Sequence, residues 1–146
     1  MISTRDFTVI IPCIKYKDVS KSLKKIRSLY TDVKIIVCLN HLRKKKIKYK
    51  NVKFIVTKSP SIAEKRNISV NNCKSKYIIF LDSDAYPDQN WIESTFSFSK
   101  KMKNCIIGGP HIDPPNQNED EKIIGLIKKS FLITMKPDFQ KNNIKI

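Results

Sequence analysis

Apolar and polar positions along the chain follow two periods. Short apolar runs, rich in β-branched and aromatic residues, predict strands at residues 7–12, 33–39, 52–56 and 77–81. After Asp18, which can cap a helix, apolar residues recur at helical spacing and leave lysines on the opposite face. Strands that alternate with helices predict an α/β fold with a doubly wound, mainly parallel sheet.

Turn and capping signals predict the remaining elements. Ser61 and Glu64 have capping-box spacing and begin a second predicted helix, over residues 61–72. Pro87 introduces a third helix, whose predicted apolar side is formed by Trp91, Thr95, Phe98 and Met102. Beyond it we expect a short strand at 105–107, a proline-containing loop at 112–118 and an amphipathic helix at 119–135.

The chain is predicted to bury one strand on both faces and to follow it with two carboxylates. Residues 77–81 form a continuous apolar run, typical of the middle of a parallel sheet, and Asp82 and Asp84 come next. Side chains alternate along an extended chain, so both carboxylates should project to one side, where α/β sheets bind ligands. Such oxygen ligands suit Mg²⁺ or Mn²⁺. Alternatively, the two residues only turn the chain and cap the next helix.

Length and composition are those of one domain, expected at residues 1–146. No apolar run approaches the roughly 20 residues that span a bilayer. No basic segment followed by a long apolar stretch begins the chain, so no signal peptide is expected. We therefore expect a cytoplasmic protein.

The formal net charge of +16 favours anionic partners. Its basic residues are 25 Lys and four Arg, spread along the chain, whereas phosphate and base readout usually recruits Arg. The dense basic run at 43–50 is therefore interpreted as an exposed loop, and no nucleic-acid partner is expected. Peripheral contact with an anionic membrane, at its inner face, is compatible with this charge. The cysteines form no C-x-x-C pair and fit buried, reduced thiols.

Four motifs in order resemble the family 2 inverting nucleotide-sugar glycosyltransferases, which have the GT-A fold. They are TVIIP at residues 8–12, the A-x-x-R-N element at 63–67, YIIFLDSDAYPDQNW at 77–91 and IIGGP at 106–110. The resemblance extends from Phe7 to about Phe131 and implies transfer of a hexosyl-type sugar from a nucleotide-diphosphate donor. The acceptor would be a saccharide, lipid or other hydroxyl compound.

The resemblance also implies roles for individual residues. Asp84 would bind Mn²⁺ or Mg²⁺ on the diphosphate, and Asp82 would contact ribose, or the metal through water. Arg66 would approach the diphosphate or orient Asp82; alternatively, it forms a structural ion pair. Pro12 and Asn40 complete the predicted nucleotide-sugar-binding residues.

Several positions depart from the family pattern. The end of the second strand reads Leu39-Asn40-His41 where the family often has an acidic pair, so Asn40 would have to read the nucleobase. No carboxylate after Gly109 matches the family's catalytic base, so the catalytic residue is unknown; Asp113 would become the first candidate if this chain alone catalysed transfer. We therefore expect a donor-binding part that is incomplete at the C-terminus.

Two other functions fit parts of the pattern. Haloacid-dehalogenase-like phosphatases also place Asp-x-Asp after an apolar strand, with the first aspartate as nucleophile. That strand usually comes first in the chain, whereas three predicted strands precede it here. A non-enzymatic basic module could bind RNA or an anionic surface through residues 43–50, but an aromatic stacking platform is missing.

Overall fold

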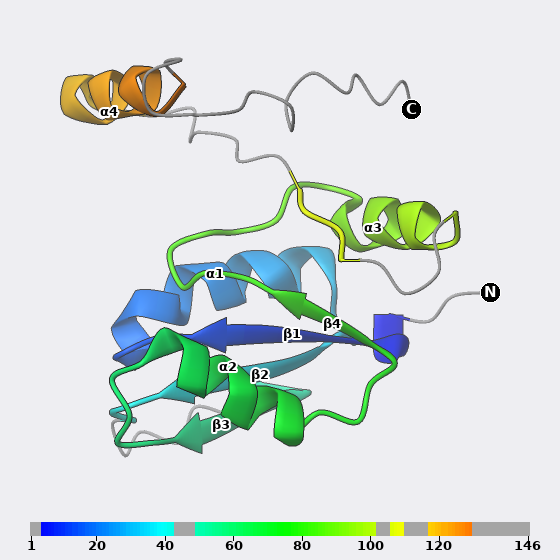
Figure 1. Cartoon of the computed structure of the whole chain (residues 1–146). Coiled ribbons are helices and arrows are strands. Elements are labelled where there is room, and N and C mark those ends of the chain that lie inside the picture. Colours follow the sequence, from blue (N-terminus) through cyan, green and yellow to red (C-terminus); the bar gives the residue numbers. More distant parts are fainter. Residues whose placement is uncertain (1–3, 43–48, 102–105, 110–116, 130–146) are drawn as a thin grey trace. The chain divides into compact units, whose positions relative to one another are not determined.

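The computed structural model describes residues 4–42, 49–101, 106–109 and 117–129 (Figure 1). The chain divides into two compact units, residues 1–97 and 98–146. In chain order the elements are the short helix η1 (Thr4–Asp6), β1 (Phe7–Pro12), α1 (Tyr16–Leu29), β2 (Lys34–Leu39), β3 (Val52–Val56), α2 (Ile62–Asn71), β4 (Tyr77–Phe80), α3 (Trp91–Ser99) and α4 (Glu119–Lys129).

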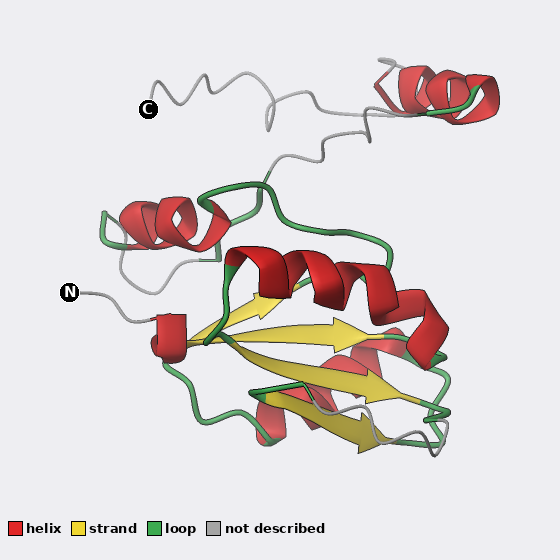
Figure 2. Cartoon of the chain, turned by 180° about the vertical axis from the view of Figure 1, so that it is seen from behind, coloured by secondary structure: helices red, strands yellow, loops and turns green. Residues whose placement is uncertain are grey.

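The first unit is built on a parallel sheet with the strand order β3-β2-β1-β4. Helix α1 covers one face of the sheet and α2 the other (Figures 1 and 2). Backbone hydrogen bonds continue past the strand ends, as from Cys13 N to Cys38 O at 2.9 Å and from Thr57 N to Leu39 O at 3.0 Å. The predicted doubly wound α/β fold is confirmed, and the carboxyl ends of its parallel strands share one edge.

The hydrophobic core lies between the sheet and α1. Phe7, Val9 and Ile11 of β1 contribute alternate side chains to it, as period-two patterning requires. They pack with side chains of β2 and with the apolar face of α1, formed by Val19, Leu23 and Ile26. Full burial of each such side chain contributes about 1.5–3 kcal/mol. This core holds α1 against the sheet and so fixes the position of the strands whose ends form the carboxyl edge.

The start of α1 differs from its prediction. The helix begins at Tyr16 with Lys15 as its N-cap residue, so Asp18 is its third residue and caps it from there rather than as the N-cap. The Asp18 carboxylate instead accepts a hydrogen bond from the Lys15 backbone N–H at 2.9 Å. An acidic residue in the first turn also complements the helix dipole. Asp18 therefore takes part in capping the helix, as predicted, but from a position three residues after the N-cap.

Strand β4 is an edge strand of the described sheet, so the prediction that it is buried on both faces is wrong. Tyr77, Ile79 and Leu81 pack against the core, but Ile78 and Phe80 are 37% and 48% exposed. Helix α2 contacts β1 and β2 and leaves the outer face of β4 only partly covered. A continuous apolar run could not distinguish these two environments.

Two later predictions also need correction. The fully buried residues of α3 are Ile92 and Phe96, whereas Trp91 of the predicted side is only partly buried against the core. Tyr30 of the first unit selects that face, because its hydroxyl donates to Glu93 Oε2 at 2.9 Å and accepts from Ile92 N at 3.2 Å. Residues 106–109 form no strand, and Ile106 is fully exposed. Met102 and Cys105 lie outside the described residues.

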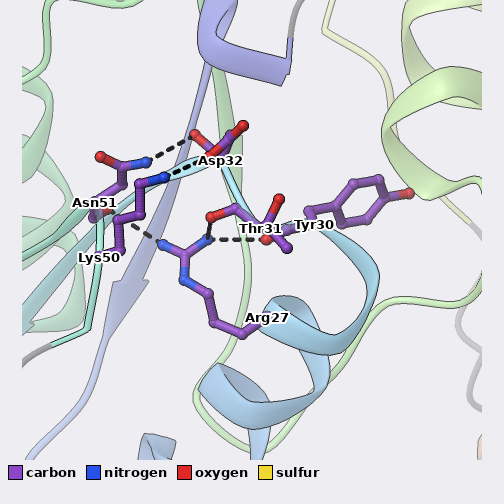
Figure 3. Close-up of polar contacts among 6 residues, drawn as sticks. All are labelled: Arg27, Tyr30, Thr31, Asp32, Lys50 and Asn51. Atoms are coloured by element: carbon purple, nitrogen blue, oxygen red, sulfur yellow. Dashed lines mark hydrogen bonds and ion pairs between the residues drawn. The ribbon is translucent and has the colours of Figure 1, made fainter.

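Arg27 closes the opposite, amino edge of the sheet (Figure 3). Its Nη1 donates to Tyr30 O at 3.0 Å and to Thr31 O at 3.4 Å, and its Nη2 donates to Asn51 O at 3.3 Å. Burial lowers the pKa of Arg27, and the charge of Asp32 partly offsets this effect. Lys50 and Asp32 form an ion pair at 3.4 Å beside it. Together these contacts bind the end of α1 to the chain before β2 and β3.

Candidate functional site

The candidate site is the carboxyl edge of the sheet in the first unit. All the strands are parallel, so the segments that follow β1, β2, β3 and β4 emerge at this edge. Open α/β sheets bind ligands there. Pro12 ends β1, Asn40 follows β2, Arg66 lies on α2, and the Asp82–Asp84 segment follows β4. The sequence-predicted residues therefore come from four neighbouring elements.

Arg66 and Asp82 are in direct contact. The guanidinium Nη2 donates to Asp82 Oδ1 at 2.9 Å, and the guanidinium carbon lies 5.6 Å from the centre of the Phe80 ring. The two side chains are 37% and 67% exposed. An exposed pair of this kind contributes only about 0–1 kcal/mol to stability. Arg66 Nε is buried without a hydrogen-bond partner among the described residues. The pair leaves polar groups of both residues accessible for further contacts.

Asp84 lies in a turn rather than in extended chain. The turn is closed by a hydrogen bond from Ala85 N to Asp82 O at 3.1 Å. Ser22 of α1 holds it by donating to Ser83 O at 2.7 Å. The argument from strand alternation therefore does not apply here, because β4 ends at Phe80. The Asp84 carboxylate is exposed and has no hydrogen-bond or ion-pair partner among the described residues.

The chemistry of the donor set fits a hydrated Mg²⁺ or Mn²⁺ ion that is shared with a phosphate ligand. Asp82 and Asp84 offer carboxylate oxygens, and Arg66 takes one of those of Asp82. In the part of the chain that the structure describes, no three His, Cys, Asp or Glu side chains gather to form a complete cage. Mg²⁺ is commonly held by one or two carboxylates together with waters and substrate phosphates.

Asn40 is held by an extensive set of hydrogen bonds. Its Nδ2 donates to Thr57 O at 3.0 Å and to Ser59 O at 2.8 Å. Its Oδ1 accepts from Lys65 Nζ at 2.6 Å. Both amide hydrogens are therefore engaged within the protein. Reading of a nucleobase by Asn40 stays a prediction, and such reading would have to use the amide oxygen.

The segment between β3 and α2 carries its own hydrogen bonds. Ser59 Oγ donates to the Glu64 carboxylate and accepts from Ser61 N at 3.1 Å. Ser61 caps α2 as predicted, because its Oγ accepts from Glu64 N at 3.3 Å. Glu64 therefore binds Ser59 rather than completing the predicted capping box. This arrangement fixes the start of the helix that carries Arg66.

Lys65 is a site residue that the sequence analysis did not predict. It is fully buried, although it lies beside Arg66 on a helix with no continuous apolar face. The available signal was weak: Lys65 and Ser69 are separated by four residues, which puts them on one face of the helix.

Cys13 and Cys38 are free and buried at this edge, as predicted, and Cys73 is free and half-buried. Burial, with a smaller effect of Asp18, raises the pKa of Cys13 to about 12. Burial also raises the pKa of Cys38. Since the thiolate is the reactive form, neither residue has the environment of a nucleophile. Residues 43–48, Asp113 and the end of the predicted last helix lie outside the described residues.

The chain has the α/β arrangement of the GT-A glycosyltransferases. Residues 8–145 match the glycosyl transferase family 2 profile, and the chain therefore belongs to that family. This membership favours a glycosyltransferase over the phosphatase and basic-module alternatives. Among curated protein sequences, none matches the chain significantly.

Solved structures support the same fold. Two crystal structures of TarS from S. aureus, one of them of residues 1–349, match with TM-scores of 0.52 and 0.55 at 17% identity. The matches cover 65% and 72% of this chain, but 19% and 38% of the TarS chains. The chain thus spans well under half the length of these proteins. No described helix is long and apolar enough to cross a membrane.

Proposed function

We propose that this chain binds a nucleotide-diphosphate sugar at its carboxyl edge and serves an inverting, metal-dependent transfer of the sugar to a hydroxyl acceptor. The observation that carries the proposal is the contact between Arg66 and Asp82, followed two residues later by an exposed Asp84 carboxylate that has no partner among the described residues. Family membership supports glycosyl transfer in general. The donor, the inversion of configuration and the metal are our inferences.

Each residue has a stated role in the proposal. Arg66 stabilises the negative diphosphate and keeps Asp82 oriented. Asp84 would hold Mn²⁺ or Mg²⁺, with Asp82 contacting ribose or the ion through water. The bound ion would supply charge neutralisation for the diphosphate leaving group. Pro12, which ends β1 and is buried, would complete the nucleotide-sugar-binding residues.

Inversion requires a base that deprotonates the acceptor hydroxyl. We assign that base to none of the described residues, and Asp113 would become the first candidate only if the chain alone catalysed transfer. The acceptor would be a saccharide, a lipid or another hydroxyl compound.

The outer face of α1 suggests how the protein meets an acceptor at an anionic membrane. Lys17, Lys21, Lys24 and Lys25 are exposed there. Such lysines contribute about 1 kcal/mol each near an anionic membrane surface. A cytoplasmic protein in peripheral contact with the inner face is consistent with this arrangement.

The test is a thermal-shift panel of UDP, GDP and dTDP and their sugar derivatives, with and without Mn²⁺. We expect one nucleotide to stabilise the chain, and more strongly with the metal. Asp84→Asn should remove the metal-dependent part. Asp88→Asn is the matched control, because Asp88 is an exposed aspartate whose hydrogen bond within the described part of the chain is to the neighbouring Gln89 N–H. No stabilisation by any nucleotide at saturating concentration would refute the proposal.

A further inference from the structure

Helix α2 packs on the sheet with its polar side chains. Lys65 and Ser69 are fully buried, whereas Ile62 is 54% exposed and Val70 is 36% exposed. A helix against a sheet normally buries its apolar residues, and an ammonium group is costly to remove from water. This reversal of the hydrophobic pattern needs a compensating role, and such departures from pattern are expected at functional sites.

The surroundings of the Lys65 ammonium do not neutralise its charge. Its hydrogen bond is to a neutral amide, Asn40 Oδ1, at 2.6 Å. No carboxylate of a described residue lies within ion-pair distance of Nζ. The nearby Cys13 and Cys38 thiols are protonated because burial raises the pKa of both. A general gain in stability therefore does not explain a lysine at this position.

The contact does determine the orientation of Asn40. A lysine ammonium only donates hydrogen bonds, so the amide oxygen must face it. The amide nitrogen then faces Thr57 O and Ser59 O, where both of its hydrogens are used. The end of β2 is thereby fastened to the segment that leads through the Ser61 cap into α2 and to Arg66.

We propose that Lys65 is a positioning residue of the donor site, an inference that rests on the proposed function. It fixes the Asn40 amide in one orientation and, through it, the segment of residues 57–61. The carboxyl edge thus receives the nucleotide in a prearranged geometry. Pre-organisation of this kind raises affinity by reducing the ordering that binding must otherwise impose.

The experiment compares four folded chains: wild type, Lys65→Met, the double variant Asn40→Leu/Lys65→Met, and Lys74→Met. The double variant replaces both hydrogen-bonding partners with apolar groups, a change that is often nearly neutral for stability. Lys74→Met makes the same substitution at an exposed lysine between α2 and β4. The probe is the nucleoside diphosphate that stabilises the wild type most, with Mn²⁺. Its Kd is measured by calorimetry well below the lowest melting temperature.

We expect the Kd to rise about tenfold or more in Lys65→Met and in the double variant, and to stay unchanged in Lys74→Met. The double variant should keep a melting temperature close to that of the wild type. A purely structural role would lower the melting temperature and leave the Kd unchanged. Wild-type affinity in either folded variant would overturn the proposed role of Lys65 and leave the proposed function standing. Failure of the wild type itself to bind would overturn the proposed function and this inference with it.

A measurement on the wild type does not depend on how the variants fold. The side-chain amide protons of Asn40 should exchange slowly with solvent, and their NMR signals should shift when the nucleotide binds. Rapid exchange, or signals that do not respond to saturating nucleotide, would overturn the proposed role of Lys65.

Discussion

Replacement of Arg66 by alanine separates a ligand-binding role from a structural one. In the free protein the change removes the 2.9 Å ion pair with Asp82 and the contact with the Phe80 ring. Both partners are substantially exposed, so together these losses should lower the free energy of unfolding by about 1 kcal/mol. For a chain of this size that corresponds to a fall in melting temperature of about 2–4 °C.

The effect on binding should be larger. A charge-assisted hydrogen bond contributes about 1.5–3 kcal/mol, so loss of the contact with a diphosphate should weaken binding roughly 10- to 100-fold. Calorimetric titration with the preferred nucleoside diphosphate and Mn²⁺ measures this effect, and thermal denaturation without ligand measures stability. The nucleoside without phosphates is the control ligand, and its affinity should change little.

Arg66→Lys refines the comparison. It keeps the charge but loses the planar fork that binds two oxygens at once, so its affinity should lie between those of wild type and Arg66→Ala. The opposite ranking would refute the reasoning. If Arg66→Ala lowered the melting temperature by well over about 4 °C and left the Kd for the diphosphate unchanged, Arg66 would be a structural partner of Asp82.

Three further predictions concern other parts of the first unit. Asp84→Asn should abolish the metal-dependent part of the stabilisation by nucleotide, without changing the melting temperature of the free protein. In the wild type, a ligand at 100 times its Kd stabilises the fold by about 2.7 kcal/mol. An unchanged response to Mn²⁺ in the variant would contradict this role. Tyr30→Phe should lower the free energy of unfolding, measured by urea denaturation, by about 1–2 kcal/mol, because it removes the partner of the buried Ile92 N–H. Tyr86→Phe, at an exposed tyrosine, is the control and should change that free energy very little. Cys13, with a pKa of about 12, should resist thiol reagents in the folded chain near pH 9. Its thiol ionises more easily when unfolded, so its contribution to stability is complete below about pH 9 and declines as the pH rises toward 12; rapid modification of native Cys13 would disprove the assignment.

The strands could be predicted because their side chains meet the requirements of a sheet directly. The ranges of β1 and β3 agree with prediction, and those of β2 and β4 differ by one residue. The position of a strand within the sheet is a different property. The run at Tyr77–Phe80 looks equally apolar whether it lies at the centre or at an edge, so its partial exposure had to come from the structure.

The candidate site was predictable only in part. The order of motifs proposed Arg66, Asp82 and Asp84 as site residues, and their helix and strand positions bring them to one edge; their roles stay predictions. Lys65 was missed because hydrophobic patterning assigns a lysine to solvent. Its burial depends on Asn40, which is 25 residues away in sequence. Contacts of that range follow from tertiary packing rather than from local pattern.

The strand order has a consequence for how the chain folds. β1 pairs with β2 on one side and with β4 on the other, and the partner of Phe7 in β4 is Tyr77, 70 residues later. In the β1–β2 pair, Thr8 lies opposite Lys34, 26 residues later. Closing the longer loop costs about 0.9 kcal/mol more in chain entropy.

During synthesis, β1, α1 and β2 can therefore assemble before β4 has left the ribosome. Until β4 arrives, one side of β1 presents unpaired backbone groups, which is a template for pairing with other chains. The segment that completes the sheet is also the one that delivers Asp82 and Asp84. Completion of the sheet and formation of the candidate site thus occur in the same late step.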